Sequence, residues 1–292
     1  MKPLRVLVLT HNSPVALRRD DRPVGFWSYA VPDFEWDIRY AGKNAFIDTH
    51  MTGYDLIWEE DGASFPQYRR GGLPIVSYIV DSTLSYENHF LPRLKQSYQA
   101  DLVLVDHDQL NRFHGNRSVR RMLHCVNDRV FKDWQRKKTV DVAFHCGSRD
   151  CEPRKETRRR LHDICKANNW IYTSGVRDLI VYAQAMNSAR IVVNVPRRDG
   201  NRPHRVFDAL ACWTCLMTQG MHVGEAFGSL QFAHDFLQWQ EYDQLEDLLE
   251  KFLRNNDWKV IADAGFLKVQ REHTWAIRAV ELRHLLNVEL HL

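Results

Sequence analysis

Short apolar runs alternate with amphipathic stretches along most of the chain. The runs are rich in β-branched and aromatic residues and have the length of β-strands. A first series comprises Leu4–Leu9, Trp36–Tyr40, Asp55–Trp58, Pro74–Val80, Leu102–Val105 and Val119–Val126. A second series comprises Val140–Cys146, Trp170–Thr173, Arg190–Val195 and Thr214–Thr218. Strands that alternate with helices predict parallel sheets built from βαβ units.

Helical periodicity lies between and after these runs, at Glu87–Tyr98, Pro153–Ala167, Asp178–Ser188, Tyr242–Leu253 and His273–Leu286. A further short helix is predicted to begin near Pro203, because proline is favoured in the first turn of a helix. The polar segment Lys132–Thr139 separates the two series and predicts a linker. We therefore predict an α/β fold with two Rossmann-like domains, residues 1–138 and 139–272, and a closing helix within residues 273–292.

The composition agrees with a two-domain protein. The chain has 292 residues, of which 44% are hydrophobic, and about 100–150 residues suffice for one domain. No apolar run approaches the roughly 18 residues of a membrane span, and the apolar run near the start is too short for a signal peptide. We therefore expect a cytoplasmic protein without a membrane span.

Basic residues gather in three clusters, although the net charge is only +3. The clusters are Arg117–Arg121, Arg154–Arg160 and Arg197–Arg205. Such clusters suit the phosphates of a nucleotide or of a polynucleotide. For Arg158–Arg160 a solvated helix face is the equally weighted alternative.

Cysteine spacing and glycine motifs exclude several classes of site. Cys212-x-x-Cys215 is a lone pair, whereas a structural zinc site needs four ligands. His145, Cys146 and Cys151 remain a weaker alternative set of ligands, and reduced core thiols are the favoured interpretation. Neither G-x-G-x-x-G nor a Walker A pattern occurs, which argues against dinucleotide and P-loop sites.

The candidate binding residues follow the predicted strands of the second half. In open α/β sheets, ligands bind beyond the carboxyl ends of the strands. Glycine, hydroxyl and guanidinium groups at these ends suit an anionic diphosphate. The predicted binding residues are Gly147, Ser148, Arg149, Ser174, Gly175, Asn194, Arg202, His204, Arg205 and Asp208. Arg205 is the first choice for a diphosphate contact, with an ion pair to Asp208 as the alternative role.

The strand ends of the first half carry carboxylates and an imidazole instead. These groups could take a proton from an acceptor hydroxyl as a general base. Asp81 is preferred because it ends a buried strand and precedes small hydroxyl residues. Asp61 is the second candidate and His11 the third.

The segment HRVFDALACWT, His204–Thr214, resembles the R-[VI]-F-E-A-L-A-C-G-T pattern of GT-B glycosyltransferases, in particular the branch of CgeB-like spore-maturation proteins. Two positions depart from the pattern, since Asp208 replaces Glu and Trp213 replaces a residue that is usually Gly. The segments Ser77–Ser82, Val140–His162 and Arg271–Leu286 resemble the same family. Together these segments cover most of residues 75–287.

The resemblance implies a GT-B architecture with two Rossmann-like domains facing a central cleft and a last helix that crosses back to the first domain. It implies transfer of a hexose or pentose from a nucleotide-diphosphate sugar, with a UDP-sugar favoured, to a hydroxyl acceptor. By analogy with the family Glu, Asp208 would accept hydrogen bonds from the ribose hydroxyls. We expect no tightly bound cofactor, no strong metal requirement, and a monomer or weak dimer.

The sequence leaves the acceptor open. One candidate is a hydroxymethylated base in double-stranded DNA, because the basic clusters could bind its phosphates. A surface glycan or a small molecule is the alternative acceptor. A non-catalytic binding module and a sugar-nucleotide epimerase are alternative functions for the same fold.

Overall fold

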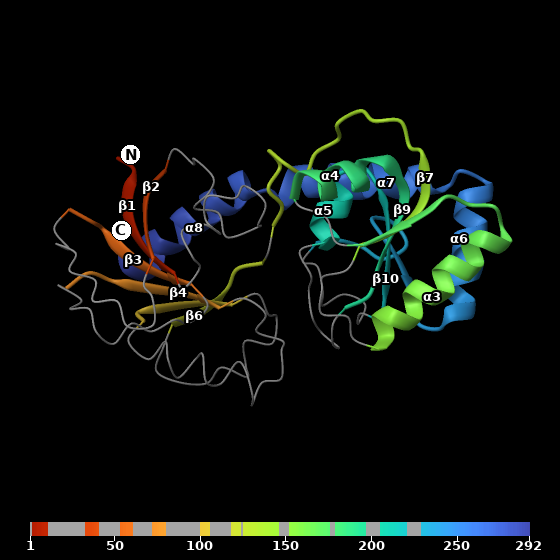
Figure 1. Cartoon of the computed structure of the whole chain (residues 1–292). Helices are drawn as coiled ribbons and strands as arrows, with labels where there is room; N and C mark the ends of the chain where they lie inside the picture. Colours follow the sequence, from red (N-terminus) through yellow and green to blue (C-terminus); the bar gives the residue numbers. More distant parts are fainter. Residues whose placement is uncertain are drawn as a thin grey trace. The chain divides into compact units, whose positions relative to one another are not determined.

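The computed structural model describes residues 2–10, 33–40, 53–60, 72–79, 100–105, 118–123, 125–145, 152–175, 179–196, 205–220 and 229–292 (Figure 1). The chain divides into two compact units. Unit 1 comprises Met1–Leu123 and Trp275–Leu292, and unit 2 comprises His124–Thr274. The division thus precedes the predicted linker, because Val126 and Phe131 belong to the hydrophobic core of unit 2.

Unit 1 contains a six-stranded parallel sheet with the order β2-β1-β3-β4-β5-β6. Its strands are β1 (Leu4–Thr10), β2 (Phe34–Tyr40), β3 (Leu56–Glu60), β4 (Ile75–Ile79), β5 (Leu102–Val105) and β6 (Ser118–Arg121). The six apolar runs of the first series each contribute one of these strands. Continuous burial, as in Leu102–Val105, is typical of parallel sheets that are covered on both faces.

The helix α8 (Trp275–Leu290) belongs to unit 1. Trp275, Ala279, Leu282 and Leu286 are buried at helical spacing, so one side of the helix packs inward. An ion pair of 2.7 Å joins Arg120 of β6 to Glu289 of α8. No helix in the described part of the chain is long and apolar enough to cross a membrane.

Unit 2 contains a five-stranded parallel sheet with the order β11-β10-β9-β7-β8. Its strands are β7 (Val140–Phe144), β8 (Tyr172–Ser174), β9 (Ala189–Asn194), β10 (Cys215–Gln219) and β11 (Leu237–Trp239). Its helices are α3 (Glu152–Ala167), α4 (Leu179–Ser188), α5 (Arg205–Ala211), α6 (Tyr242–Arg254) and α7 (Trp258–Glu272). The first and last parts of the unit are bonded to each other, since the Val126 N–H donates to the His273 carbonyl over 2.9 Å.

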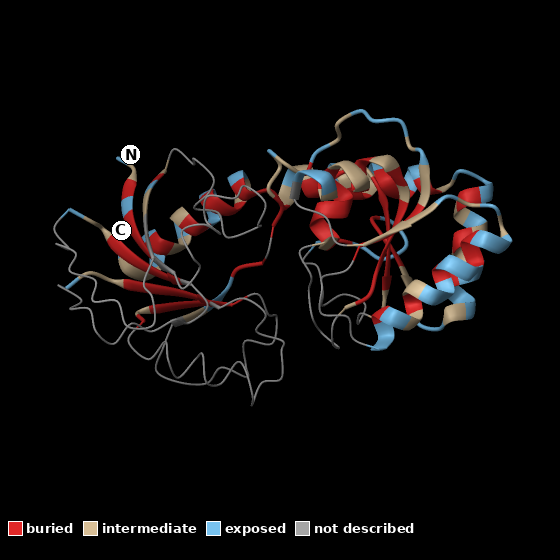
Figure 2. Ribbon diagram, viewed as in Figure 1, coloured by how far each residue is buried: buried red, intermediate tan, exposed pale blue. Residues whose placement is uncertain are grey.

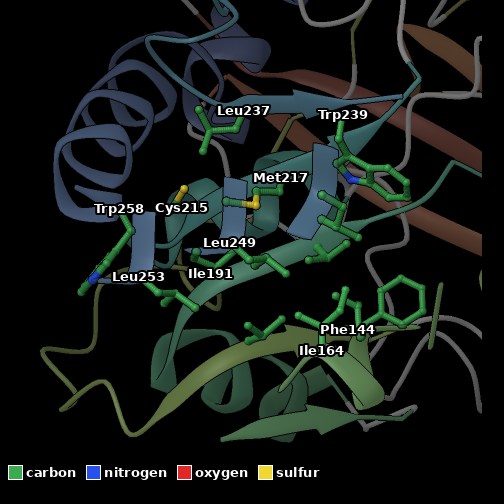
Figure 3. Packing of buried hydrophobic residues seen from close by; sticks show 14 of the residues in the cluster. Phe144, Ile164, Ile191, Cys215, Met217, Leu237, Trp239, Leu249, Leu253 and Trp258 are labelled. Atoms are coloured by element: carbon green, nitrogen blue, oxygen red, sulfur yellow. The ribbon is translucent and has the colours of Figure 1, made fainter. Parts of the chain in front are cut away.

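Alternate residues of β9 enter two separate cores, as the two-residue period of a strand requires. Ile191 and Val193 pack with residues of α3 and α6, and Figure 3 shows Ile191 beside Leu249. Val192 packs on the opposite side with residues of α4 and α5. Both faces of the sheet are therefore covered, and the central strands β7, β9 and β10 are buried along most of their length (Figure 2).

Two elements of unit 2 were not predicted from the sequence. The strand β11 has only three residues, and α7 follows α6 after a short turn. Gly265 explains how α7 comes close to its neighbours, because an added Cβ would lie 2.4 Å from the Asp235 carbonyl oxygen. The predicted helix Glu87–Tyr98 lies outside the described residues.

Candidate functional site

The described candidate residues gather at one edge of the sheet of unit 2. Ser174 ends β8 and Asn194 ends β9, while Arg205 and Asp208 lie in the first turn of α5. Because the strands are parallel, their carboxyl ends lie along the same edge. Gly175 follows β8 with a φ of 129°, in the region that favours glycine.

Gly147, Ser148, Arg149, Arg202 and His204 lie outside the described residues, as do Asp81, Asp61 and His11. The roles predicted for these residues therefore remain predictions.

Two side chains hold the guanidinium group of Arg205. Its Nη1 donates to Asn194 Oδ1 over 2.9 Å, and its Nε donates to the Tyr182 hydroxyl over 3.2 Å. Asn194 is fully buried, and its Nδ2 donates in turn to Thr218 Oγ1 on the neighbouring strand over 2.9 Å. The guanidinium is therefore fixed at the carboxyl end of β9 before any ligand binds, so little ordering entropy remains to be lost.

Asp208 is a buried carboxyl group with only 5% of its surface exposed. Burial raises its pKa to about 8, and the positive charge of Arg205 offsets part of this effect. Burial likewise raises the pKa of Tyr182, so its hydroxyl is neutral and can accept from Arg205. The carboxyl of Asp208 can accept hydrogen bonds in either protonation state, although it accepts more strongly when ionised.

His145 follows β7 and Tyr182 lies beside it on α4, and neither was among the predicted donor-binding residues. His145 is buried, and its Nδ1 lies 3.0 Å from the Gly175 carbonyl oxygen. Since a carbonyl only accepts, Nδ1 must carry the proton. The His145 ring meets the Tyr182 ring edge-on at 5.9 Å. His145 thus joins the end of β7 to the turn after β8, and its position after an apolar run was the available signal.

The turn from α5 to β10 keeps its expected shape although Trp213 replaces the usual Gly. Trp213 has a φ of 54°, the left-handed conformation that glycine adopts after a helix. This costs a non-glycine residue about 1–2 kcal/mol. The indole Nε1 donates to Asp263 over 2.5 Å, and the ring packs edge-on against Trp258 at 5.7 Å. The contacts of Trp213 with α7 therefore offset the free-energy cost of its left-handed backbone conformation.

The described cysteines behave as core residues. Cys125, Cys165, Cys212 and Cys215 are buried free thiols. Burial raises the pKa of the Cys212 and Cys215 thiols, so both stay protonated. No group of three or more His, Cys, Asp or Glu that could hold a metal is found within the described ranges, which omit Cys146 and Cys151.

Within the described residues, the clusters Arg117–Arg121 and Arg154–Arg160 contain ion pairs. Arg159 and Arg160 both contact Glu156, at 2.7 Å and 2.9 Å, on the exposed side of α3. Their hydrogen bonds lower the pKa of Glu156 to about 2. Together with the pair between Arg120 and Glu289, these contacts reduce the positive charge available to a polynucleotide.

Solved structures with the same fold are glycosyltransferases. HepE from Anabaena, in complex with UDP and glucose, has a TM-score of 0.64 and 12% identity over 98% of this chain and 100% of that chain. Sucrose-phosphate synthase from Thermosynechococcus elongatus has a TM-score of 0.61 and 14% identity over 99% of each chain. An alpha-glucosyltransferase in complex with UDP-glucose and DNA containing an abasic site has a TM-score of 0.61 and 9% identity, over 98% of this chain and 100% of that one.

These likenesses establish the GT-B fold, as the sequence predicted. The model of the family described as glycosyl transferase-like matches residues 117–284, and the chain belongs to this family. The protein is therefore an enzyme of the glycosyltransferase class. No curated protein sequence matches the chain closely enough to narrow this assignment.

Replacing Asp208 with Asn should change how stability depends on pH. An unfolded Asp has a pKa of about 3.9, whereas buried Asp208 has a pKa of about 8. Between these values the folded protein retains a proton that the unfolded chain releases. The free energy of unfolding of the wild type should therefore fall with rising pH, by at most about 1.4 kcal/mol per pH unit from this group.

The stabilising contribution is complete below about pH 4 and is lost as the pH rises through 8. An amide side chain has no such proton, so the Asp208→Asn variant should lose less stability than the wild type between about pH 5 and pH 8. Urea denaturation across this range measures the difference. Asp247→Asn, at an exposed position on α6, is the control. Parallel stability profiles for wild type and Asp208→Asn would contradict the assigned burial effect.

Proposed function

We propose that the protein transfers a sugar from a nucleotide-diphosphate sugar, most simply a UDP-sugar, to an acceptor hydroxyl. The observation that carries the proposal is the fixed guanidinium of Arg205 beside buried Asp208 at the carboxyl edge of the sheet. The UDP and UDP-glucose bound in the HepE structures support UDP as the nucleotide. The CgeB-like branch remains our proposal for the subfamily.

Arg205 would bind the diphosphate and stabilise it as it leaves. Breaking the bond between sugar and phosphate develops negative charge on the diphosphate and positive charge on the sugar ring. A guanidinium can donate two parallel hydrogen bonds to phosphate oxygens. Because Asn194 and Tyr182 already fix this group, it need not reorganise as the charge forms.

Asp208 would accept hydrogen bonds from the ribose hydroxyls of the donor. It lies one turn after Arg205 on α5, so both groups can face the same ligand. Ser174 ends β8, Gly175 follows it, and Asn194 ends β9 on the other side of β7. These residues would complete the described part of the donor site. Gly147, Ser148, Arg149, Arg202 and His204 are proposed to join them.

The catalytic base is proposed to be Asp81, with Asp61 and then His11 as the next candidates. An inverting transfer needs one group that takes the proton from the acceptor hydroxyl. A carboxylate after a predicted strand of the first half suits that role. The protein is proposed to act in the cytoplasm, as a monomer or weak dimer, without a strong metal requirement.

The proposed acceptor is a hydroxymethylated base in double-stranded DNA. The alpha-glucosyltransferase solved with DNA supports this choice, since its chain is matched over its whole length. The ion pairs of Arg120, Arg159 and Arg160 weigh against a broad basic surface. A surface glycan or small molecule remains the alternative acceptor, and a binding module or an epimerase the alternative function.

Replacing Arg205 with Ala should weaken UDP binding about 10- to 150-fold, the loss expected for a charge-assisted hydrogen bond. Isothermal titration calorimetry with UDP measures the effect. Arg190→Ala is the matched control, since Arg190 pairs with Asp141 on neighbouring β7 and lies near the opposite end of β9. Unchanged UDP affinity in a folded Arg205→Ala protein would exclude the assigned contact.

Replacing Asp81 with Asn should lower turnover about 10²- to 10⁴-fold while UDP affinity stays nearly unchanged. An amide can still bind the acceptor hydroxyl but cannot take its proton. Sugar transfer and UDP calorimetry are measured on the same preparation. If the variant keeps more than about a third of wild-type turnover, a general base of the usual strength is excluded at this position. Asp61 and then His11 would be tested next.

A DNA acceptor predicts sugar transfer to duplex DNA and an affinity for the duplex that depends on the salt concentration. Incubation with a panel of UDP-sugars should modify duplex DNA that contains hydroxymethylated bases but leave unmodified duplex unchanged. Affinity for the duplex should fall steeply between about 50 and 200 mM salt, because bound counterions are released. Turnover on an oligosaccharide acceptor without transfer to either duplex would instead favour the glycan alternative.

A further inference from the structure

One side of α7 carries apolar residues that are exposed. Val260 and Leu267 have 68% and 64% of their surfaces exposed, and the partly buried Ala264 lies between them in the sequence. Residues three and four positions apart lie on the same side of a helix, so these three residues form one apolar stripe. Gly265 and Val269, on the opposite side of α7, are buried within unit 2. The apolar stripe therefore takes no part in the packing of unit 2.

Opposite charges lie at the two ends of the apolar stripe. Asp257 comes one turn before Val260, and Arg271 comes one turn after Leu267. Asp257 occupies the N-cap position of α7, yet its side chain makes no capping hydrogen bond to the helix. The carboxylate of Asp257 is therefore available to a cation outside α7.

Arg271 also retains the capacity to bind a further group. Its side chain is 69% exposed. Its Nε and Nη2 both donate to Glu272 Oε1, over 3.0 Å and 2.7 Å. A guanidinium has five N–H donors, so the contact with Glu272 leaves donors for a second carboxylate.

The order of these residues along α7 is complementary to its own reverse. An acidic residue, an apolar residue, a small residue, an apolar residue and a basic residue follow one another. A two-fold axis through Ala264 would place Asp257 of one copy beside the partner's Arg271, and Val260 beside the partner's Leu267. Each contact in such a symmetric interface occurs twice. Parallel helices would instead bring like charges together, so the charge order favours an antiparallel pair.

We propose that α7 is the interface of a homodimer, in which the helices of two copies pack antiparallel and cross at Ala264. The small side chain of Ala264 allows a close approach of the two helices, whose axes lie about 8–10 Å apart in packed pairs. A single helix gives a small interface, so the dimer is weak and forms only at high protein concentration. The proposed dimer does not depend on the identity of the donor or the acceptor.

Sedimentation equilibrium tests the apolar part of this interface. The average mass of the wild type should rise from the monomer value of 34.4 kDa towards twice that value. A weak interface calls for concentrations from about 10 µM to about 1 mM. Leu267→Glu removes two apolar contacts per dimer, so the dissociation constant should rise about 10-fold or more. Val280→Glu is the matched control, since Val280 is 62% exposed on α8, and it should dimerise as the wild type does.

A charge exchange tests the antiparallel arrangement. Asp257→Arg places two guanidinium groups side by side at each end of the interface, and Arg271→Asp does the same with two carboxylates. Each single variant should raise the dissociation constant about 10-fold or more, because like charges repel across an interface. The double variant Asp257→Arg/Arg271→Asp restores both pairs and should return to within about 3-fold of the wild type. A double variant as weak as the single variants would overturn the proposal.

Two further outcomes would also overturn it. A wild type that keeps the monomer mass at every concentration forms no such dimer. A dimer that Leu267→Glu forms as readily as the wild type uses another surface. Urea denaturation at a concentration where both proteins are monomeric identifies a different occupant within the same chain. If Leu267→Glu is then less stable than the wild type, another part of the chain covers the apolar stripe and the proposal fails.

Discussion

The hydrogen bond between Arg205 and the buried amide of Asn194 is the contact on which the candidate site depends. The Asn194 side chain donates to Thr218 on β10 and accepts from Arg205 on α5, so it links two strands and a helix. Both its amide and its carbonyl oxygen are used within the fold. A mobile arginine would lose conformational entropy on binding an anion, whereas this one is already oriented by the strand that precedes it.

The surroundings of α5 also decide the charge state of the site. Asp208 and Tyr182 are removed from water strongly enough that both favour their neutral forms, while the guanidinium of Arg205 keeps its charge. The edge of the sheet therefore has a positive character. A site of this kind attracts an anionic ligand, and excluded water strengthens the attraction. The shorter Asp at position 208 keeps a hydrogen-bonding carboxyl group despite its difference from the Glu of the family pattern.

The sequence predicted the two sheets because strands buried on both faces form unbroken apolar runs, as at Leu102–Val105. It missed β11 and α7 for different reasons. β11 is too short to show a period, and α7 is held by a close approach at Gly265 that only the tertiary structure reveals. Asn194, Arg205 and Asp208 were chosen from the sequence because they lie at or after the end of a recognisable strand, and their binding roles remain predictions. Tyr182 was missed because a tyrosine within an apolar helix gives no sign of which partner its hydroxyl meets.

The same limit applies to Trp213 and Arg154. A tryptophan in place of glycine suggests an altered turn, yet α7 supplies the contacts that keep the left-handed backbone. Arg154 looks like one member of a surface cluster until its burial and its bond to Val195 are known. Local patterns report secondary structure well, but they do not report which distant groups satisfy a polar side chain.

The hydrogen bond from Val126 to His273 has a consequence for how the polypeptide is threaded. Unit 2 is an insertion: the chain enters it after residue 123 and leaves it after residue 274 to complete unit 1 with α8. The segment that enters unit 2 and the segment that leaves it are bonded to each other, since Val126 pairs with His273 and Thr274. Unit 2 therefore behaves as a loop whose two ends are held together. Lengthening or trimming surface turns inside such an insertion changes the closure entropy only slowly. The sequence and length of unit 2 can therefore vary, while the two chain segments of unit 1 remain correctly placed with respect to each other.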